Sequence, residues 1–229
     1  MSRKVITILS GAGISRESGL QTFRDMDGLW EGYNVEEVCT PQALKKNPEM
    51  VLDFYNLRRK AVAEAQPNSA HFALADLEQF HEVRIITQNI DDLHERAGST
   101  KILHLHGEIF VARSIEDSDL RQEIRGDIKV GDLASDGAQL RPHICFFQET
   151  PFNWDTALQW VTECDEFIVI GTSLNVYPAA GLVDIARNKP ITIIDPNPPA
   201  RNGVSTIALP ATEGVPLYIK KLLELGKVE

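Results

Sequence analysis

Five short polar or glycine-rich segments directly follow apolar runs, most of them β-branched, and these segments hold the residues best suited to chemistry. They span residues 10–15, 88–91, 106–107, 171–173 and 195–197. If the five runs are parallel strands, all five segments lie at the carboxyl edge of one sheet, where open α/β sheets bind ligands. The sequence therefore predicts a ligand site along this edge.

The first of these segments is rich in glycine. Gly11 and Gly13, which flank Ala12, would let the backbone approach a phosphate group at the start of a helix. The next glycine is Gly19, so the spacing differs from the G-x-G-x-x-G of dinucleotide-dependent dehydrogenases. The glycines alone fit a tight strand–helix turn equally well. If they bind a nucleotide, the protein is not an ordinary dehydrogenase.

His106 is the best candidate for a general base, because histidine titrates near neutral pH. His104 lies two residues earlier on the same predicted strand, so it should point to the same side. The two histidines could suggest a metal, but the sequence offers no third ligand nearby. Asn89 and Asp91 are candidate site residues, and a helix cap is an equally good interpretation of their local sequence.

Tyr55 and Arg58 are three residues apart on a predicted helix and therefore share a face. A phenol beside a guanidinium could bind a carboxylate, with two parallel bonds from the arginine. Local sequence alone favours the more ordinary interpretation, a half-buried tyrosine next to a solvated basic face.

The order of the elements predicts an α/β fold with a doubly wound, parallel, Rossmann-like sheet, because strands alternate with helices. The predicted strands are residues 5–9, 83–87, 102–105, 167–170 and 191–194. The predicted helices are residues 49–65, a segment capped by Asn68, residues 178–186 and residues 216–225. Residues 107–145 break the alternation, so we expect an inserted excursion there rather than core sheet.

Composition and charge exclude several classes of protein. The chain has 229 residues, 43% of them hydrophobic, which is ordinary for a globular protein, and its net charge of −10 argues against a nucleic-acid partner. The three cysteines lie far apart and form no C-x-x-C motif. The apolar run at residues 5–9 is short for a signal sequence, and no run approaches the length of a membrane span. We therefore expect a cytoplasmic protein with no membrane partner.

Taken together, these segments resemble the sirtuin family of NAD-dependent protein deacylases. The similarity runs from about residue 5 to residue 225 and is carried by motifs at residues 11–15, 18–19, 22–24, 87–91, 106–107 and 171–173. Tyr55-Asn56-Leu57-Arg58 matches the Tyr-x-x-Arg signature of the desuccinylase and demalonylase class of bacterial deacylases. The resemblance implies one catalytic domain over residues 1–229. Its Rossmann-like core would comprise about 1–30, 68–106 and 146–229, with a small helical module from about 31–67 and 107–145.

The resemblance also implies the reaction and its residues. NAD would be a co-substrate, and an acylated-lysine protein or peptide would yield free lysine, nicotinamide and O-acyl-ADP-ribose. His106 would be the base, with Asn89 and Asp91 as further catalytic residues. The implied NAD-binding residues are Gly11, Ala12, Gly13, Ser15, Phe23, Arg24, Trp30, Gln88, Asn89, Ile90, Asp91, His106, Gly171, Thr172, Ser173, Asp195, Pro196, Asn197 and Ala211.

The implied substrate contacts lie elsewhere in the chain. Tyr55 and Arg58 would bind an acidic acyl group. The peptide would pair in extended form between residues 146–149, which include Phe146 and Phe147, and residues 174–177.

The chain departs from the family at its zinc site. The positions aligned with the four zinc cysteines carry Ser114, Asp117, Leu133 and Asp136, so we expect no zinc. The excursion would instead be held by packing, and the residues expected to supply it are Leu120, Ile124, Ile128 and Leu133. A measured zinc content near one ion per chain would contradict this expectation.

Two further departures lie along the expected peptide groove, where Gln148 replaces a glycine and Leu174 a small residue. Both side chains are expected to narrow the groove. Other functions therefore stay open, namely a mono-ADP-ribosyltransferase, an NAD glycohydrolase, or a nucleotide-sensing module without catalysis. The Tyr55 and Arg58 pair favours the deacylase over the two enzymes, and the intact His106, Asn89 and Asp91 argue against the sensor.

Overall fold

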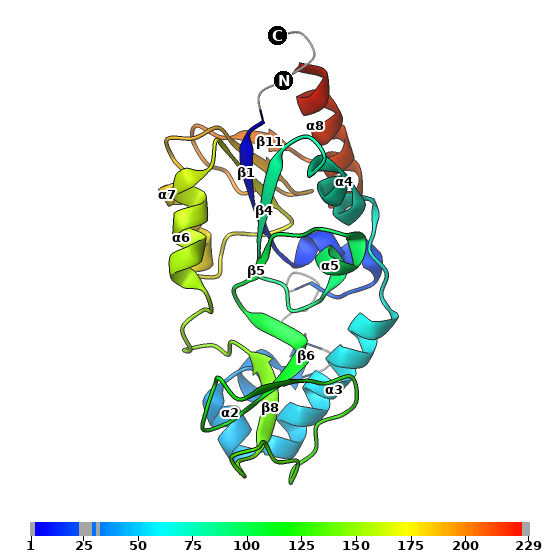
Figure 1. Ribbon diagram of the computed structural model, residues 1–229, viewed down its shortest axis with the longest axis vertical. Helices are drawn as coiled ribbons and strands as arrows, with labels where there is room; N and C mark the ends of the chain where they lie inside the picture. The colour runs from blue at the N-terminus through cyan, green and yellow to red at the C-terminus, as the bar shows by residue number, and fades with distance from the viewer. Residues whose placement is uncertain (1–2, 23–28, 31–32, 226–229) are drawn as a thin grey trace.

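The computed structural model describes residues 3–22, 29–30 and 33–225, and its main feature is a six-stranded parallel sheet (Figure 1). The strand order is β11-β10-β9-β1-β4-β5. The bounds are β1 Val5–Ser10, β4 Glu82–Thr87, β5 Ile102–His104, β9 Glu166–Ile170, β10 Ile191–Ile194 and β11 Ser205–Ile207. The predicted α/β class with a doubly wound parallel sheet is confirmed.

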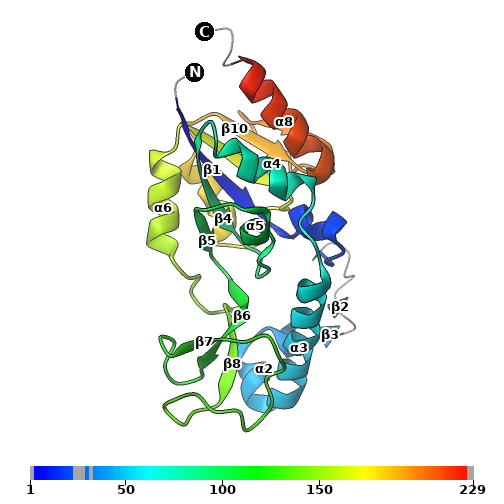
Figure 2. The same cartoon turned by 45° about the vertical axis from the view of Figure 1, so that its right-hand side comes forward.

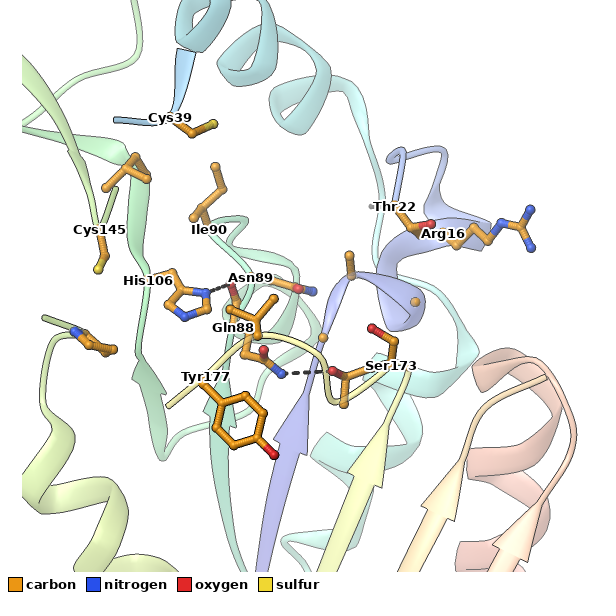
Figure 3. A pocket seen from close by; sticks show the side chains of 18 of the residues that line it. Arg16, Thr22, Cys39, Gln88, Asn89, Ile90, His106, Cys145, Ser173 and Tyr177 are labelled. Carbon is orange, nitrogen blue, oxygen red and sulfur yellow. Dashed lines mark hydrogen bonds between the residues drawn. The ribbon is translucent and has the colours of Figure 1, made fainter. Parts of the chain in front are cut away.

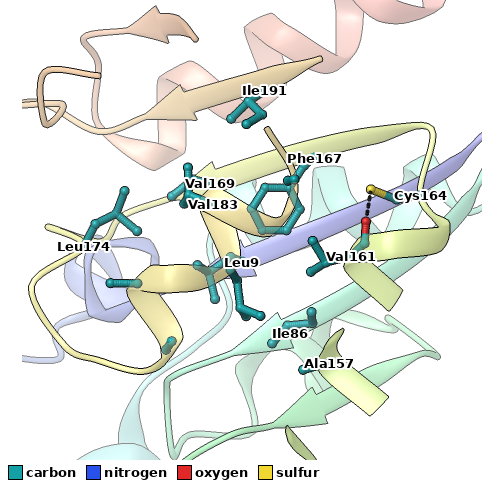
Figure 4. Close-up of a cluster of buried hydrophobic side chains, with 14 of the residues drawn as sticks. Leu9, Ile86, Ala157, Val161, Cys164, Phe167, Val169, Leu174, Val183 and Ile191 are labelled. Atoms are coloured by element: carbon teal, nitrogen blue, oxygen red, sulfur yellow. Dashed lines mark hydrogen bonds between the residues drawn. The ribbon is translucent and has the colours of Figure 1, made fainter. Parts of the chain in front are cut away.

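Helices cover both faces of this sheet, as its continuous apolar strands require. Ile6 and Ile8 of β1 face a cluster that includes side chains of α4 and α8. Leu9 faces the opposite cluster, formed with side chains of α6 and α7 (Figure 4). These helices are α4 Ser69–Leu77, α8 Ala211–Leu225, α6 Trp154–Glu163 and α7 Leu182–Ile185, with the 3₁₀ turn η3 Ala179–Gly181 before α7. The period-two alternation along β1 thus supplies both halves of the core.

A smaller module lies beyond the carboxyl edge of the sheet, at the lower end of Figures 1 and 2. It combines the short helices α1 Val35–Val38 and α2 Pro41–Lys46 with the longer α3 Pro48–Glu64 and the strand pair β2 Leu29–Trp30 and β3 Tyr33–Asn34. Thr40 and Asn47 cap α2 and α3 with side-chain bonds to backbone N–H groups, and a proline follows each cap.

The excursion at residues 107–145 adds a three-stranded antiparallel sheet of order β7-β6-β8 to this module. Its strands are β6 Gly107–Ser114, β7 Arg121–Glu123 and β8 Leu140–Ile144. The excursion lies outside the six-stranded sheet, as expected, but its own strands were not predicted.

The packing predicted for the excursion is partly wrong. Ile128 is buried, and Ile124 packs against the same cluster, which also contains Leu52, Ala112, Ala134 and Leu140. Leu133 is 58% exposed instead, and Leu120 is only partly buried and lies outside the cluster. Leu133 pairs with Gln139 across a turn, so alternation directs Ala134 inward and Leu133 to solvent.

Two other elements differ from their predicted extents. Helix α8 begins at Ala211, so Pro216 lies inside it. Pro216 has no N–H to offer the Thr212 carbonyl four residues earlier. That carbonyl accepts a bond from Ser69 Oγ of α4 instead (2.8 Å). The predicted helix at residues 178–186 is divided into η3 and α7. Within the described residues, no helix is both long and apolar enough to span a membrane.

Candidate active site

The sheet reverses its winding order between β1 and β9, and two glycine-rich loops meet at that point. Gly11 N donates to Ile170 O (2.9 Å), and Gly13 N donates to Gly171 O (2.8 Å). A Cβ on Gly13 would lie 2.7 Å from Gly171 Cα, and one on Gly171 would lie 2.4 Å from Ile14 N. The glycines are therefore needed for this contact, and they leave bare backbone facing the crevice that doubly wound sheets use for nucleotides.

A cavity of about 380 Å³ opens over this crevice and extends to α3. The residues predicted to bind NAD that line it are Gly11, Ala12, Gly13, Gln88, Asn89, Ile90, His106, Gly171, Thr172, Ser173, Asp195, Pro196, Asn197 and Ala211. Tyr55, Phe146 and Phe147 line it too. A smaller adjoining cavity of about 50 Å³ is lined by Ser15, Asp91 and Arg58 and shares Ile90 with the first. Phe23 and Arg24 lie outside the described residues, as does the side chain of Trp30.

His106 lies between β5 and β6, with its ring in the larger cavity (Figure 3). Its Nδ1 is 2.9 Å from the carbonyl oxygen of Gln88, which can only accept, so Nδ1 carries the proton of the neutral ring. Nε2 is then a free acceptor. Burial lowers the pKa of His106, and the bond to Gln88 opposes this shift. At neutral pH the ring is therefore an uncharged base.

His104 does not share this position. Its Nδ1 bonds to Asn89 O (3.1 Å) and its Nε2 to Glu95 Oε1 (2.8 Å), and it does not line the cavity. Burial lowers its pKa, but the bond to Glu95 and the nearby acidic charges raise it by more, so the net shift is upward. Strand β5 ends at His104, so strand alternation does not hold as far as His106.

Asn89 and Asp91 both border the cavities, and only Asp91 also bonds to the backbone N–H of Leu93. Asn89 Nδ2 donates to Ser15 Oγ (3.1 Å), and Ser15 Oγ donates to Asp91 Oδ2 (3.1 Å). Asp91 Oδ1 also accepts from the N–H of Leu93, which begins α5 (Leu93–Ala97) (3.2 Å). Burial raises the pKa of Asp91, and the bonds from Leu93 and Ser15 oppose this. This buried chain joins the glycine-rich loop to the segment after β4.

Tyr55 closes the other end of the larger cavity. Its ring stacks on Phe146 with centroids 5.6 Å apart, and its hydroxyl donates to Cys39 Sγ (3.4 Å). Arg58 lies one helical turn further on, is buried, and lines the smaller cavity. The predicted pair therefore borders two neighbouring cavities that share the lining residues Ala12, Gln88, Asn89 and Ile90.

The two expected peptide segments contribute to the cavity wall. Their unusual residues, Gln148 and Leu174, differ in whether the side chain faces the cavity or the core. Both Gln148 and Leu174 have left-handed backbone, with φ of 75° and 56°. Gln148 is exposed at the cavity and accepts a bond from Gln42 Nε2 (3.2 Å). Leu174 packs into the sheet core and is 5% exposed (Figure 4), so the expectation that it narrows the groove is wrong.

Several residues in the cavity wall were missed by sequence reasoning. Cys39, Arg16 and Glu17 line the cavity without belonging to any predicted motif. Arg16 and Glu17 follow the glycine loop within η1 Ala12–Ser18, so their proximity to that loop was the available signal. Cys39 carried no signal, because only the packing of α1 and α2 against α3 brings it to Tyr55.

The positions aligned with the zinc cysteines are partly joined by hydrogen bonds. Ser114 Oγ donates to Asp136 Oδ2 (2.7 Å) and accepts from the Asp117 backbone N–H (3.2 Å). Across residues 3–22, 29–30 and 33–225, no group of three or more His, Cys, Asp or Glu side chains is placed to hold a metal ion. The absence of zinc stays a prediction for metal analysis.

Comparison with known proteins identifies the family. A model of the Sir2 family matches residues 11–178. An NAD-dependent protein deacylase of Aggregatibacter actinomycetemcomitans is 53% identical over 86% of this chain and 95% of its own length.

Two solved structures share the fold over nearly the whole chain. A Sir2 homologue in complex with NAD has a TM-score of 0.86 and 38% identity, covering 96% of this chain and 90% of its own. A mutant Sir2 homologue in complex with 2′-O-acetyl-ADP-ribose also has a TM-score of 0.86, with 37% identity, covering 96% and 92%. Gly11, Gly13 and Gly171 line the cavity with bare backbone, which is what the close approach of a nucleotide diphosphate requires. The chain belongs to the Sir2 family.

Proposed function

We propose that this chain is an NAD-dependent protein-lysine deacylase that acts on acetyl, succinyl and malonyl groups and prefers the acidic succinyl and malonyl groups. Its products would be free lysine, nicotinamide and O-acyl-ADP-ribose. The supporting observation is one cavity that holds the Gly11–Gly171 backbone contact at one end, the partly buried, neutral His106 in its wall and Tyr55 at the other end. The match to a curated NAD-dependent protein deacylase supports the same reaction.

In the proposed reaction, residues at different places along the cavity have different roles. Bound NAD supplies an ADP-ribosyl group that accepts the acyl group when nicotinamide leaves. The glycine loops give that end a backbone surface close enough for a diphosphate. His106 accepts a proton at Nε2 from a ribose hydroxyl, because its Nδ1 is already committed to Gln88. The Ser15–Asn89–Asp91 chain holds the loop beside it.

The acyl preference rests on Tyr55 and Arg58. Both are buried, so a carboxylate reaching them would leave water and bind through charge-assisted hydrogen bonds. The Tyr55 hydroxyl now donates to Cys39 and would turn to the substrate carboxylate. An acetyl group has no carboxylate to bind there, so the pair distinguishes succinyl and malonyl groups from acetyl.

The test compares one lysine peptide in acetyl and succinyl forms, with and without NAD, by mass spectrometry. We expect NAD-dependent loss of succinyl faster than acetyl, with an O-acyl-ADP-ribose product. In Arg58→Met the succinyl rate should fall about ten- to a hundredfold, since a charge-assisted bond contributes roughly 1.5–3 kcal/mol. The acetyl rate should change far less.

Lys60→Met is the matched control, because Lys60 lies on the same helix but is exposed and pairs with Asp127. It should leave both rates unchanged. Equal losses on both peptides in Arg58→Met would refute the carboxylate-binding role. Consumption of NAD with both peptides unchanged would instead favour an NAD glycohydrolase or an ADP-ribosyltransferase.

A further inference from the structure

An ion pair anchored on the inserted sheet holds the cavity segment at residues 144–149. Arg141 of β8 donates from Nη1 to Glu149 Oε1 (2.7 Å) and from Nη2 to Glu149 Oε2 (3.2 Å). The Arg141 side chain is 6% exposed and that of Glu149 is 24% exposed. Two parallel bonds between planar groups fix orientation as well as distance.

The same two side chains also bind the backbone between them. Arg141 Nη2 donates to Ile144 O (2.9 Å), and Glu149 Oε2 accepts from Phe146 N (2.7 Å). The Arg141 guanidinium lies over the Phe146 ring, 3.8 Å from its centre. Phe146 also stacks on the ring of Tyr55. Phe146 is thereby fixed and buried, while the following residue, Phe147, is 42% exposed in the cavity wall.

We propose that Arg141 is a positioning residue for the acyl-lysine peptide. Together with Glu149 it holds residues 146–149 in the arrangement that the peptide binds. This inference rests on the proposed function, because it requires a peptide along this segment. Arg141 does not line the cavity, so it acts through the segment and not on the reacting atoms.

The contacts of Arg141 separate its effect from NAD binding. Its side-chain hydrogen bonds and its ring contact go to Ile144, Phe146 and Glu149. The glycine cradle is built from the loops after β1 and β9, which share no hydrogen bond with Arg141 among the described residues. Loss of Arg141 should therefore raise the KM for the peptide and leave the KM for NAD in place.

The experiment measures both KM values, kcat and the Tm for the full-length wild type and for Arg141→Gln, using acetyl and succinyl peptides. We expect the peptide KM to rise about tenfold or more in Arg141→Gln. The rise should appear with both acyl groups, because the segment is proposed to bind the peptide backbone that both peptides share. The KM for NAD should stay within about twofold. Arg141→Lys should recover part of the loss, since an ammonium keeps the charge but not the two parallel bonds.

Arg121→Gln is the matched control, because Arg121 lies on neighbouring β7 with its side chain 46% exposed. It should change none of these quantities. If Arg141→Gln fails to fold, the double variant Arg141→Gln/Glu149→Gln replaces it, since it removes both charges of the bidentate pair together.

Two outcomes would overturn the inference. One is an unchanged peptide KM in a folded variant, and the other is an equal rise in the KM for NAD, which a general loss of structure would produce. If the wild type consumes NAD but alters neither peptide, the proposed function itself has failed. If the wild type deacylates the peptides and the Arg141 variants do so with the same peptide KM, only the proposed role of Arg141 is refuted.

Discussion

One hydrogen bond and partial burial suit His106 to its proposed role as the base. The Gln88 carbonyl fixes the tautomer, so the cavity-facing Nε2 holds a lone pair instead of a proton. Burial disfavours the imidazolium form and lowers the pKa of His106 below its ordinary 6.5. Both effects keep the ring ready to accept a proton at neutral pH.

The pH dependence of deacylation follows from this shift. Because the pKa of His106 is lowered, the neutral ring persists as the pH falls to 6.5, and the rate should decline only below that value. We expect kcat/KM against pH to show its acidic limb below pH 6.5. The measurement needs a constant ionic strength and a check that the enzyme regains full activity on return to neutral pH. An acidic limb above pH 7 would contradict the assignment of His106 as the base.

The residue scale also shows what a sequence can predict of such a site. His106, Asn89 and Gly171 were identified because each follows a strand end, and parallel strands gather their carboxyl ends at one edge. Cys39 was missed because its proximity to Tyr55 depends on how three helices pack. Sequence spacing predicted that Arg58 and Tyr55 share a helix face. It could not reveal that Tyr55 lines one cavity and Arg58 lines the adjoining one.

Helix α3 is the element that joins the cavity to the inserted sheet. Tyr55 and Arg58 line the cavities from it, whereas Asn56 and Arg59 bind the excursion. Asn56 makes two bonds to Ile128, donating to its carbonyl and accepting from its N–H (both 2.9 Å). Arg59 Nη1 donates to Asn56 Oδ1 (2.7 Å), and Arg59 Nε donates to Ile109 O (2.9 Å).

Asn56→Ala should loosen the inserted sheet. It removes both partners of Ile128 and the Arg59 acceptor, leaving buried polar groups unpaired, and we expect a loss of about 2–4 kcal/mol in the free energy of unfolding. Urea unfolding measures this loss, and amide exchange should show faster opening at residues 124–134. Asp53→Ala, at an exposed position on the same helix, is the control. Unchanged exchange in Asn56→Ala would show that the excursion is held by its apolar cluster alone.

Elements were predictable where burial and hydrophobicity coincide. Strand β10 was predicted with its observed bounds, Ile191–Ile194, because all four residues are apolar or β-branched and all are buried. Strand β8 is buried throughout as well, but its interior residues are Arg141, Pro142 and His143, so it carries no hydrophobic pattern. Strand β11 was missed because it has three residues and is largely exposed. Pro216 concealed the start of α8, since proline ordinarily ends a helix pattern.

At the scale of the whole molecule, two buried histidines link stability to pH. The rings of His71 and His94 lie 5.0 Å apart, and His94 Nε2 bonds to Ser10 Oγ at the end of β1 (3.0 Å). His71 Nδ1 accepts from Asn68 N (3.3 Å), which completes the cap of α4. Burial lowers the pKa of His71 to about 4 and that of His94 well below 6.5.

The fold should therefore lose stability on acidification. The unfolded chain protonates these histidines near pH 6.5, whereas the folded chain does so only near pH 4 for His71, so protons favour unfolding between those values. His71 alone contributes about 3 kcal/mol at pH 7 that disappears as the pH falls to 4. His71→Gln keeps an acceptor for the cap but cannot titrate. Its stability should fall less steeply than that of the wild type between pH 6.5 and 4, and an identical slope would contradict this origin.

The backbone contact between Gly13 and Gly171 makes the two ends of the cavity unequal as targets for redesign. A single methyl group at either glycine would force two loops apart, since it would meet backbone atoms at 2.7 Å or less. At the other end the wall includes the Cys39, Tyr55 and Phe146 side chains, so a substitution there changes side-chain volume and does not press a new atom against backbone. Mutagenesis confined to the Tyr55 end would therefore vary the proposed acyl preference and leave the contact between the glycine loops in place.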